Sequence, residues 1–297
     1  MSTSGDIYLC QVSQTVSCGA CCGLYNLAVP SRQGIRSLLE RRTAAFARVP
    51  REMAAVLDFG QRESEALSKN PAPMPEFHHC PYLGFIGRKK SRVGCLLHPR
   101  AENNNGIDLR GLSHYGSMTC QMYFCPTHRR IAPDFKRILR SVIDDWYLFG
   151  LVIQEKALLS AFYEEITRRC RSSGLDPAAA FRPHARKLWD RLFGLKISWP
   201  YAADNSPLAN YFFNDELYPK PQVDYSAAGS TGSRYDAIFR ELHSVFASKA
   251  ELSAAEQLLD GLFAELAGTV CGSKRIRSPN AGIQKIFACP AHNGNLE

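Results

Sequence analysis

Cysteine is the residue type in this chain whose number and spacing could do chemistry. Eight of the eleven cysteines fall within the first 125 residues, and three of them lie together in the segment Cys18-Gly-Ala-Cys21-Cys22. Thiolates at such close spacing, separated by small residues that let the chain turn sharply, are typical ligands of zinc and iron-sulfur sites. The sequence therefore predicts a metal centre with eight candidate ligands: Cys10, Cys18, Cys21, Cys22, Cys80, Cys95, Cys120 and Cys125.

The adjacent pair Cys21 and Cys22 bears on the number of sites. Successive side chains of an extended chain point to opposite sides, so both sulfurs could reach one tetrahedral ion only through a distorted turn. Two neighbouring sites, or one polynuclear cluster, accommodate the pair better. Ordinary buried free cysteines are the alternative, and the clustering of eight disfavours it.

Two patterns point to different metals. Cysteine is followed by proline three times, at Cys80, Cys125 and Cys289, and proline after a ligand is a feature of iron-sulfur sequences. Mixed cysteine and histidine sets are instead typical of zinc, and four histidines lie near the cysteines: His78, His79, His98 and His128. We slightly prefer an iron-sulfur cluster to zinc, and we expect each of these histidines to be a hydrogen-bonded residue rather than a ligand.

The order of the cysteine motifs resembles a known family. Cys18-Gly-Ala-Cys21-Cys22 is followed by Cys80-Pro-Tyr-Leu and then by Arg92-Val-Gly-Cys95-Leu-Leu-His-Pro99. This succession is similar to the CxxCxxCC family of YkgJ-type zinc- or iron-chelating proteins, over about residues 8 to 130. The resemblance implies metal chelation by about eight cysteines. Flagellin lysine N-methylases have a similar cysteine-rich signature, so the question of an enzyme stays open.

Composition indicates a globular protein. The 297 residues are 45% hydrophobic and 22% charged, which is enough apolar material for one large domain or two ordinary ones. No basic and apolar leader begins the sequence, and the most apolar run, residues 146 to 153, is too short for a membrane span. We therefore expect a cytoplasmic protein without membrane contact. Thiols stay reduced in that compartment, so Cys170, Cys271 and Cys289 are expected to be free. The alternative for the last is that Cys289-Pro-Ala-His292 returns to complete a metal site.

Positive charge is concentrated in the first half of the chain. Residues 1 to 130 hold 16 lysines and arginines against 9 aspartates and glutamates, whereas residues 131 to 297 hold 20 against 19. Several thiolates would cancel most of the first surplus, so the basic side chains are interpreted as balancing a thiolate site. The one dense basic run, Arg88 to Arg92, is interpreted as the solvated tip of a hairpin, with a phosphate contact as the less favoured alternative.

The first half is predicted to hold few regular elements. A helix broken at Pro50 is expected over residues 31 to 70, followed by a proline-rich linker at residues 70 to 77. Short apolar runs at residues 82 to 86 and 93 to 97 predict a β-hairpin, which Cys80 precedes and in which Cys95 lies on the return strand. Residues 101 to 117 are predicted to be a loop. We expect residues 1 to 130 to form a metal-organised domain.

The second half, residues 131 to 297, is predicted to be a helical bundle. An apolar stripe with helical spacing runs from Phe135 to Trp146, and the pattern resumes from Leu158 to Ile166. Further helices are expected over residues 177 to 194 and 235 to 246, with a loop over residues 195 to 233 between them. A last helix is expected to start at the capping box Ser253 to Glu256 and to end before Gly268. The fold class is thus mainly α with one short β-hairpin.

Three functions are compatible with these features. The preferred one is a cytoplasmic protein that chelates iron, as an iron-sulfur cluster, or zinc. A metal-cluster-dependent enzyme of redox or methyl-transfer chemistry is the second, and a zinc-ribbon-like module that binds nucleic acid through Arg88 to Arg92 is the third. A protein partner is possible, nucleic acid is disfavoured as a partner, and no catalytic residue is indicated.

Overall fold

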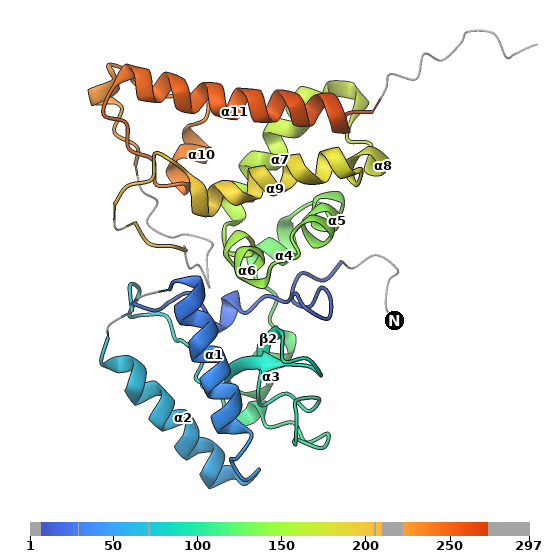
Figure 1. Cartoon of the computed structure of the whole chain (residues 1–297), viewed down its shortest axis with the longest axis vertical. Coiled ribbons are helices and arrows are strands. Elements are labelled where there is room, and N and C mark those ends of the chain that lie inside the picture. Colours follow the sequence, from blue (N-terminus) through green and yellow to red (C-terminus); the bar gives the residue numbers. More distant parts are fainter. Residues whose placement is uncertain (1–6, 29, 71, 205, 210–221, 273–297) are drawn as a thin grey trace, which may run out of the picture.

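The computed structural model describes residues 7–28, 30–70, 72–204, 206–209 and 222–272. Its elements fall into two parts along the long axis of the molecule (Figure 1): the helices that follow residue 132 form the upper part, and the first two helices and the hairpin form the lower part. Cys289 and His292 lie outside the described residues.

The lower part contains α1 (Arg32–Phe46), α2 (Met53–Ser68), β1 (Leu83–Ile86) and β2 (Arg92–Cys95). Ser31 caps α1 by accepting a hydrogen bond from the backbone N–H of Gly34, and the chain between the two helices contains Pro50, as expected. The strands are antiparallel, with Leu83 paired to Cys95 and Ile86 paired to Arg92. The predicted hairpin and broken helix are therefore confirmed.

Two short helices connect the parts, α3 (Gly116–Met122) and α4 (Pro126–Arg130). The predicted loop that precedes them contains one 3-10 turn, η2 (Arg110–Leu112). Pro126 is the first residue of α4, a position at which proline costs no helical hydrogen bond. Both helices follow the hairpin directly in the chain and bring the last two N-terminal cysteines back toward it.

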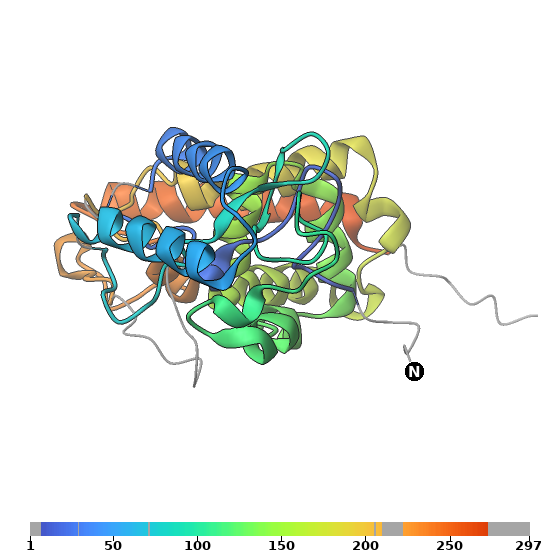
Figure 2. The same ribbon diagram turned by 90° about the horizontal axis from the view of Figure 1, so that it is seen from below.

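The upper part is helical throughout its ordered elements. Its helices are α5 (Pro133–Val142), α6 (Trp146–Gln154), α7 (Lys156–Cys170), α8 (Pro177–Ala180), α9 (Pro183–Ser198), α10 (Asp236–Glu241) and α11 (Lys249–Val270), with a 3-10 turn η3 (Arg171–Ser173) and another, η4 (Ser226–Ala228). α11 packs against both α7 and α9. In the view from below, the lower part lies in front of these helices (Figure 2). The mainly helical class with one hairpin is confirmed.

The expected apolar stripe from Phe135 to Trp146 is interrupted, because α5 ends at Val142 and α6 begins at Trp146. Asp145 caps α6 by accepting from the N–H of Leu148 at 2.7 Å, so the backbone at Asp144 and Asp145 is not helical. Glu155 separates α6 from α7, and its fully buried carboxylate lies 2.7 Å from the Lys196 ammonium. These polar side chains end one helix and begin the next.

The start of α11 differs from the predicted one. Ser248 is the N-cap, its hydroxyl accepts from the N–H of Glu251, and the Glu251 carboxylate accepts from the N–H of Ala247. The N-cap thus lies five residues before the expected capping box at Ser253, which is inside the helix, and the Glu251 carboxylate bonds to the residue before the N-cap.

The expectation that Cys170 and Cys271 are free is wrong. The two form a disulfide that joins the ends of α7 and α11 across a sequence separation of 101 residues. The backbone supports the same closure, because the N–H of Asp176 donates to the carbonyl of Val270 at 2.8 Å. Adjacent helix ends therefore bring two thiols together that no local spacing connects.

Buried apolar residues form two clusters. One is centred on α1, α2 and the hairpin and includes Trp146 and Leu151 of α6. The other is built by the upper helices and includes Leu9 and Val16 of the N-terminal segment. Because α6 and the N-terminal segment contribute to both sides, the domain boundary at residue 130 stays a prediction. None of the described helices combines the length and apolarity needed to cross a bilayer.

Candidate metal centre

The first two candidate ligands are joined by a narrow loop of the N-terminal segment. Gln11 and Ser17 form an isolated antiparallel bridge, and the N–H of Cys18 donates to the carbonyl of Cys10 at 2.9 Å. The Ser17 hydroxyl donates to the carbonyl of Val93 in β2, which holds this loop against the hairpin. Cys10 and Cys18 are thereby neighbours although seven residues separate them.

The vicinal cysteines end a single turn of 3-10 helix, η1 (Ala20–Cys22). Gly23 follows in a left-handed conformation with φ of 77°, and a Cβ at this position would lie 2.4 Å from the carbonyl oxygen of His78. Only glycine permits this approach. The N–H of Cys80 donates to the carbonyl of Cys22 at 2.9 Å, so the turn brings the Cys80 segment against the vicinal pair.

The remaining candidates come from the hairpin and from α3 and α4. Cys95 ends β2, and its register opposite Leu83 places it close to Cys80, which precedes β1. Cys120 lies in α3, where its sulfur is 3.1 Å from the Ser113 hydroxyl, and Cys125 is the N-cap of α4. All eight are free thiols; Cys80 is buried, Cys120 is exposed, and the others are half-buried.

Electrostatic contacts divide the eight thiols into two groups of four. Cys10 and Cys18 each interact with Cys21 and Cys125, and Cys125 interacts with Cys21. We name this set the Cys18 group: Cys10, Cys18, Cys21 and Cys125. Cys22 interacts with Cys80 and Cys95, and both of these interact with Cys120. This second set is the Cys80 group: Cys22, Cys80, Cys95 and Cys120.

The vicinal pair is the point of division. Cys21 faces the Cys18 group and Cys22 faces the Cys80 group, while the two thiols also hydrogen-bond to each other. This bond lowers the pKa of Cys21 and, together with burial, raises the pKa of Cys22 well above its usual range. The two sulfurs thus lie within hydrogen-bond distance of each other, and each also interacts with thiols of a different group.

Desolvation raises the pKa of five further thiols and favours their protonated form. Burial and the neighbouring sulfurs raise the pKa of Cys10 and Cys80 to about 12, and burial raises the pKa of Cys95 and Cys125 to about 11. Burial likewise raises the pKa of Cys18 well above its usual range. Thiolate formation at neutral pH in these positions requires a strong compensating positive charge, which a metal ion supplies.

Backbone N–H groups point at four of the sulfurs in one repeated pattern. The N–H of Ala20 donates to the Cys18 sulfur at 3.4 Å, and the N–H two residues after each of Cys80, Cys95 and Cys125 donates to that sulfur. Two of these cysteines belong to each group. Such N–H donors stabilise a negative sulfur, and they are the outer-shell partners that tune metal-bound thiolates.

A buried guanidinium lies behind the Cys80 group. Arg42 is fully buried; its Nε donates to Glu63 at 2.9 Å and its Nη1 donates to the carbonyl of Cys80 at 3.2 Å. Arg41 forms a bidentate pair with the same carboxylate, at 2.6 and 2.8 Å. Two guanidinium groups thus share one carboxylate. The positive charge of Arg42 acts on Cys80, and that of Arg110 acts on Cys95.

The four histidines make other contacts. His79 bonds to Arg42 at 2.8 Å and to the carbonyl of Gly23 at 2.7 Å. His128 accepts from the N–H of Leu9, and His98 accepts from the N–H of Arg100. His78 stacks on His114, with ring centroids 4.1 Å apart. None of these contacts joins a histidine ring to a sulfur.

The thiols of the Cys18 group and of the Cys80 group lie near one another but do not form a preformed metal site. Four thiolates around one zinc ion have sulfurs about 3.8 Å apart, from Zn–S bonds of about 2.3 Å, whereas electrostatic contacts act over longer distances. Among the residues that the structure describes, no three or more His, Cys, Asp and Glu side chains have the arrangement of a metal site. Rotation of side chains, Cys21 and Cys22 first, is required for four sulfurs to meet.

Several residues near the sulfurs carry no signal in the sequence. Arg42 lies in the middle of α1, and Ser113 and Tyr115 lie in the loop that precedes α3. Tyr115 interacts with Cys21, Cys22 and Cys80, and burial raises the pKa of its hydroxyl. These contacts depend on tertiary structure alone, so no spacing rule could have found them.

Comparison of the whole chain with protein-family models, with curated proteins and with solved structures finds no match in any of the three. The likeness to the CxxCxxCC family therefore stays a prediction that depends on the motifs themselves.

Proposed function

We propose that the chain is a metal-binding protein in which each cysteine group holds one zinc ion or one iron-sulfur cluster. The observation that carries this proposal is the division of the eight thiols into two groups of four, separated at Cys21 and Cys22. Four is the number of thiolates that a tetrahedral zinc ion or a cubane cluster takes. A random set of buried cysteines has no reason to divide in this way.

The electrostatic surroundings support the proposal. Four thiolates around a divalent ion leave an excess of two negative charges, which must be balanced when the site is away from water. The Cys80 group has the guanidinium groups of Arg42 and Arg110 beside it, and N–H donors reach Cys80 and Cys95. The Cys18 group has N–H donors at Cys18 and Cys125.

The two metals would supply different chemistry. Zinc would tie together segments that share few apolar contacts, and an iron-sulfur cluster would in addition accept or donate an electron. The chain's own residues hold the sulfurs, exclude water from Cys80 and balance charge. We retain the iron-sulfur cluster as slightly preferred, because proline follows Cys80 and Cys125.

We propose a cytoplasmic location for this activity. Eight thiols that stay free at close spacing suit a reducing compartment, in which a dense cysteine pattern serves metal binding. The disulfide between Cys170 and Cys271 is the one feature that favours an oxidising environment. It lies in the upper helices, away from both cysteine groups in the sequence.

Elemental analysis of anaerobically purified full-length protein tests the proposal. We expect iron, with inorganic sulfide and visible absorbance, or zinc in colourless protein, in a stoichiometry that corresponds to two sites. Freshly purified protein that contains neither iron nor zinc, and that takes up neither when both are supplied with sulfide, would falsify the proposal.

Cysteine variants test the division into two sites. Cys18→Ala and Cys80→Ala should each lower the metal content by roughly half, because each removes one of four ligands from one site. The matched control is Cys170→Ala, which removes a cysteine outside both groups and should leave metal content unchanged. Complete loss of metal from either single variant would instead indicate one shared polynuclear cluster and would contradict two separate sites.

A further inference from the structure

Two hollows lie beside the hairpin, outside the cysteine groups. The larger, of about 510 Å³, is formed where the N-terminal loop meets the end of the hairpin and the turn that follows β2; we name it the Arg92 hollow, lined among others by Gln11, Gln14, Arg92, His98 and Arg100. The smaller, of about 350 Å³, is the Phe46 hollow, lined among others by Phe46, Phe85, Arg88, Leu96 and Arg100. Both share Ile86, Gly87, Arg100 and Ala101, so they lie on two sides of one wall.

The Arg92 hollow is lined by hydrogen-bond donors and by no carboxylate. Arg92 is anchored by one bond from its Nη1 to the carbonyl of Ser13, at 3.2 Å, while its Nε is buried and has no partner among the described residues. A buried N–H without an acceptor is costly and calls for one. The arrangement therefore presents an unused donor that a bound acceptor would satisfy.

Arg100 and His98, which also line this hollow, can donate hydrogen bonds to a bound molecule. Arg100 is exposed and forms no ion pair with any described carboxylate. The His98 Nδ1 accepts from the N–H of Arg100 at 3.1 Å, which leaves the Nε2 of a neutral ring as the protonated nitrogen. Two guanidinium groups and an imidazole N–H at one hollow suit an anion with several acceptor oxygens.

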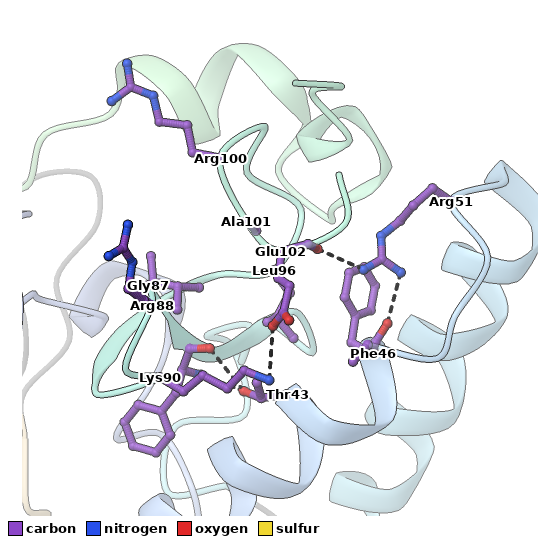
Figure 3. Close-up of a pocket in the computed structure, with 13 residues that line it drawn as sticks. Thr43, Phe46, Arg51, Gly87, Arg88, Lys90, Leu96, Arg100, Ala101 and Glu102 are labelled. Carbon is purple, nitrogen blue, oxygen red and sulfur yellow. Dashed lines mark hydrogen bonds and ion pairs between the residues drawn. The ribbon is translucent and has the colours of Figure 1, made fainter. Parts of the chain in front are cut away.

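Figure 3 shows how the cations of the Phe46 hollow differ. Lys90 pairs with the carboxylate of Glu102 at 3.0 Å, and Arg51 donates to the carbonyls of Phe46 and Glu102. Within the described residues, no ion pair of this kind involves Arg88 or Arg100, and in Figure 3 both side chains extend away from Phe46. Phe46, Phe85 and Leu96 are buried apolar residues of the wall, and the Arg51 guanidinium lies 4.3 Å from the centroid of the Phe46 ring.

We propose that the Arg92 hollow binds the phosphate of a small organic phosphate, whose organic part lies against the apolar wall of the Phe46 hollow. Phosphate offers the several oxygens that forked guanidinium donors match, and the volumes are those of small-molecule sites. A nucleic acid strand would use the whole basic tip of the hairpin, including Lys89, which lines neither hollow. None of the eight cysteines lines this site.

Calorimetric titration of the full-length protein with ATP and with inorganic pyrophosphate, at low ionic strength, tests the proposal. Arg92→Lys keeps the charge but removes the Nε donor, and Arg100→Ala removes an exposed guanidinium. Each should weaken ATP binding about tenfold, the effect of one lost charge-assisted contact. Pyrophosphate should bind more weakly than ATP and should lose affinity in the same variants.

The controls separate a built site from surface charge. Lys89→Ala removes a cation of the hairpin tip that lines neither hollow, and Arg186→Ala removes an exposed cation of α9; both should leave the affinity for ATP unchanged. Circular dichroism of Arg92→Lys checks its fold, and Arg100→Ala provides the same test at an exposed residue. The proposal would be overturned if Lys89→Ala weakened ATP binding as much as Arg92→Lys does, or if neither ATP nor pyrophosphate bound. It would also be overturned if a single-stranded oligonucleotide bound more tightly than ATP and lost affinity in the same variants.

Discussion

The two cores of the molecule are held together by different chemistry. In the upper helices, aromatic and aliphatic side chains pack in a large apolar cluster, and one disulfide closes the ends of α7 and α11. In the lower part, the cluster is smaller, the sheet has two strands, and Arg42, Glu63 and the cysteine groups lie in or beside the interior, whereas the upper helices contain the buried pair of Glu155 and Lys196. Apolar burial organises the first region, and directed polar contacts organise much of the second.

This difference indicates how each region should fail. An apolar core loses stability gradually as side chains are shortened, because each contact is small. A region that depends on a few ligands and one shared carboxylate loses much of its stability when one partner is removed. The following predictions are meant to break or sharpen this contrast.

Metal removal should give the largest effect. Metal binding contributes about 10–16 kcal/mol in small zinc modules, which is comparable to the stability of a whole domain. A strong chelator should therefore unfold the segment that carries the two cysteine groups and leave the upper helices folded. Circular dichroism should show retained helix, and limited proteolysis should yield a resistant fragment that begins near α5.

A chelated protein whose N-terminal half resists protease as well as the untreated protein does would contradict this expectation. A matched treatment with a reductant that breaks only the disulfide serves as the control, since it should leave cleavage within the cysteine region unchanged.

Removal of the shared carboxylate should come next. Glu63→Ala leaves Arg42 fully buried without its anion, which costs about 3–5 kcal/mol for a broken buried pair. Glu40→Ala is the matched control: Glu40 forms an exposed pair with Arg36 on the same helix, at 3.6 Å, and its loss should cost less than about 0.5 kcal/mol. Urea denaturation of both variants measures the difference. Equal costs would show that Arg42 does not depend on Glu63.

Loss of the disulfide should affect the other region by a smaller amount. Cys170→Ala with Cys271→Ala opens a closed loop of about 100 residues, and removal of a native disulfide typically costs about 2–4 kcal/mol. We expect a lower melting temperature for the upper helices and an unchanged metal content. Unchanged thermal stability of the double variant would mean that helix packing alone closes the ends of α7 and α11.

The fold followed from sequence where patterns are local. Proline positions gave the break between α1 and α2, and alternating apolar runs gave the hairpin. The helix break at Asp145 escaped prediction because a capping carboxylate overrode the apolar stripe expected from Phe135 to Trp146. The N-cap of α11 was predicted five residues too late, because Ser248 and Ser253 are both followed by a glutamate three residues later and the pattern alone does not choose between them.

The candidate site was predictable in its residue types and in part of its arrangement. Chain direction at Cys21 and Cys22 implied that two adjacent sulfurs diverge, and the structure sends them to different groups. Which distant cysteines join each group depends on the hairpin register and on the position of α3. The pairing of Cys170 with Cys271 likewise depends on helix packing over 101 residues.

Acid should weaken the lower region through His79. Its Nε2 accepts from Arg42, which can only donate, so the proton is on Nδ1 and is donated to the carbonyl of Gly23. Burial and the nearby charge of Arg42 lower the pKa of His79 to about 3, whereas its ordinary value is 6.5. Between these values the unfolded chain binds the extra proton, so stability falls as pH decreases from 6.5 toward 3.

The expected loss is about 1 kcal/mol between pH 6.5 and about pH 5.5. His79→Gln keeps an acceptor for Arg42 but cannot take up a proton, so its unfolding free energy should fall less steeply over that interval. His184→Gln, at an exposed position of α9, is the control and should keep the slope of the unsubstituted protein. Identical slopes for all three proteins in urea denaturation would mean that His79 is not held neutral by Arg42. The positive charge of Arg42 would then act on Cys80 without setting the protonation state of His79.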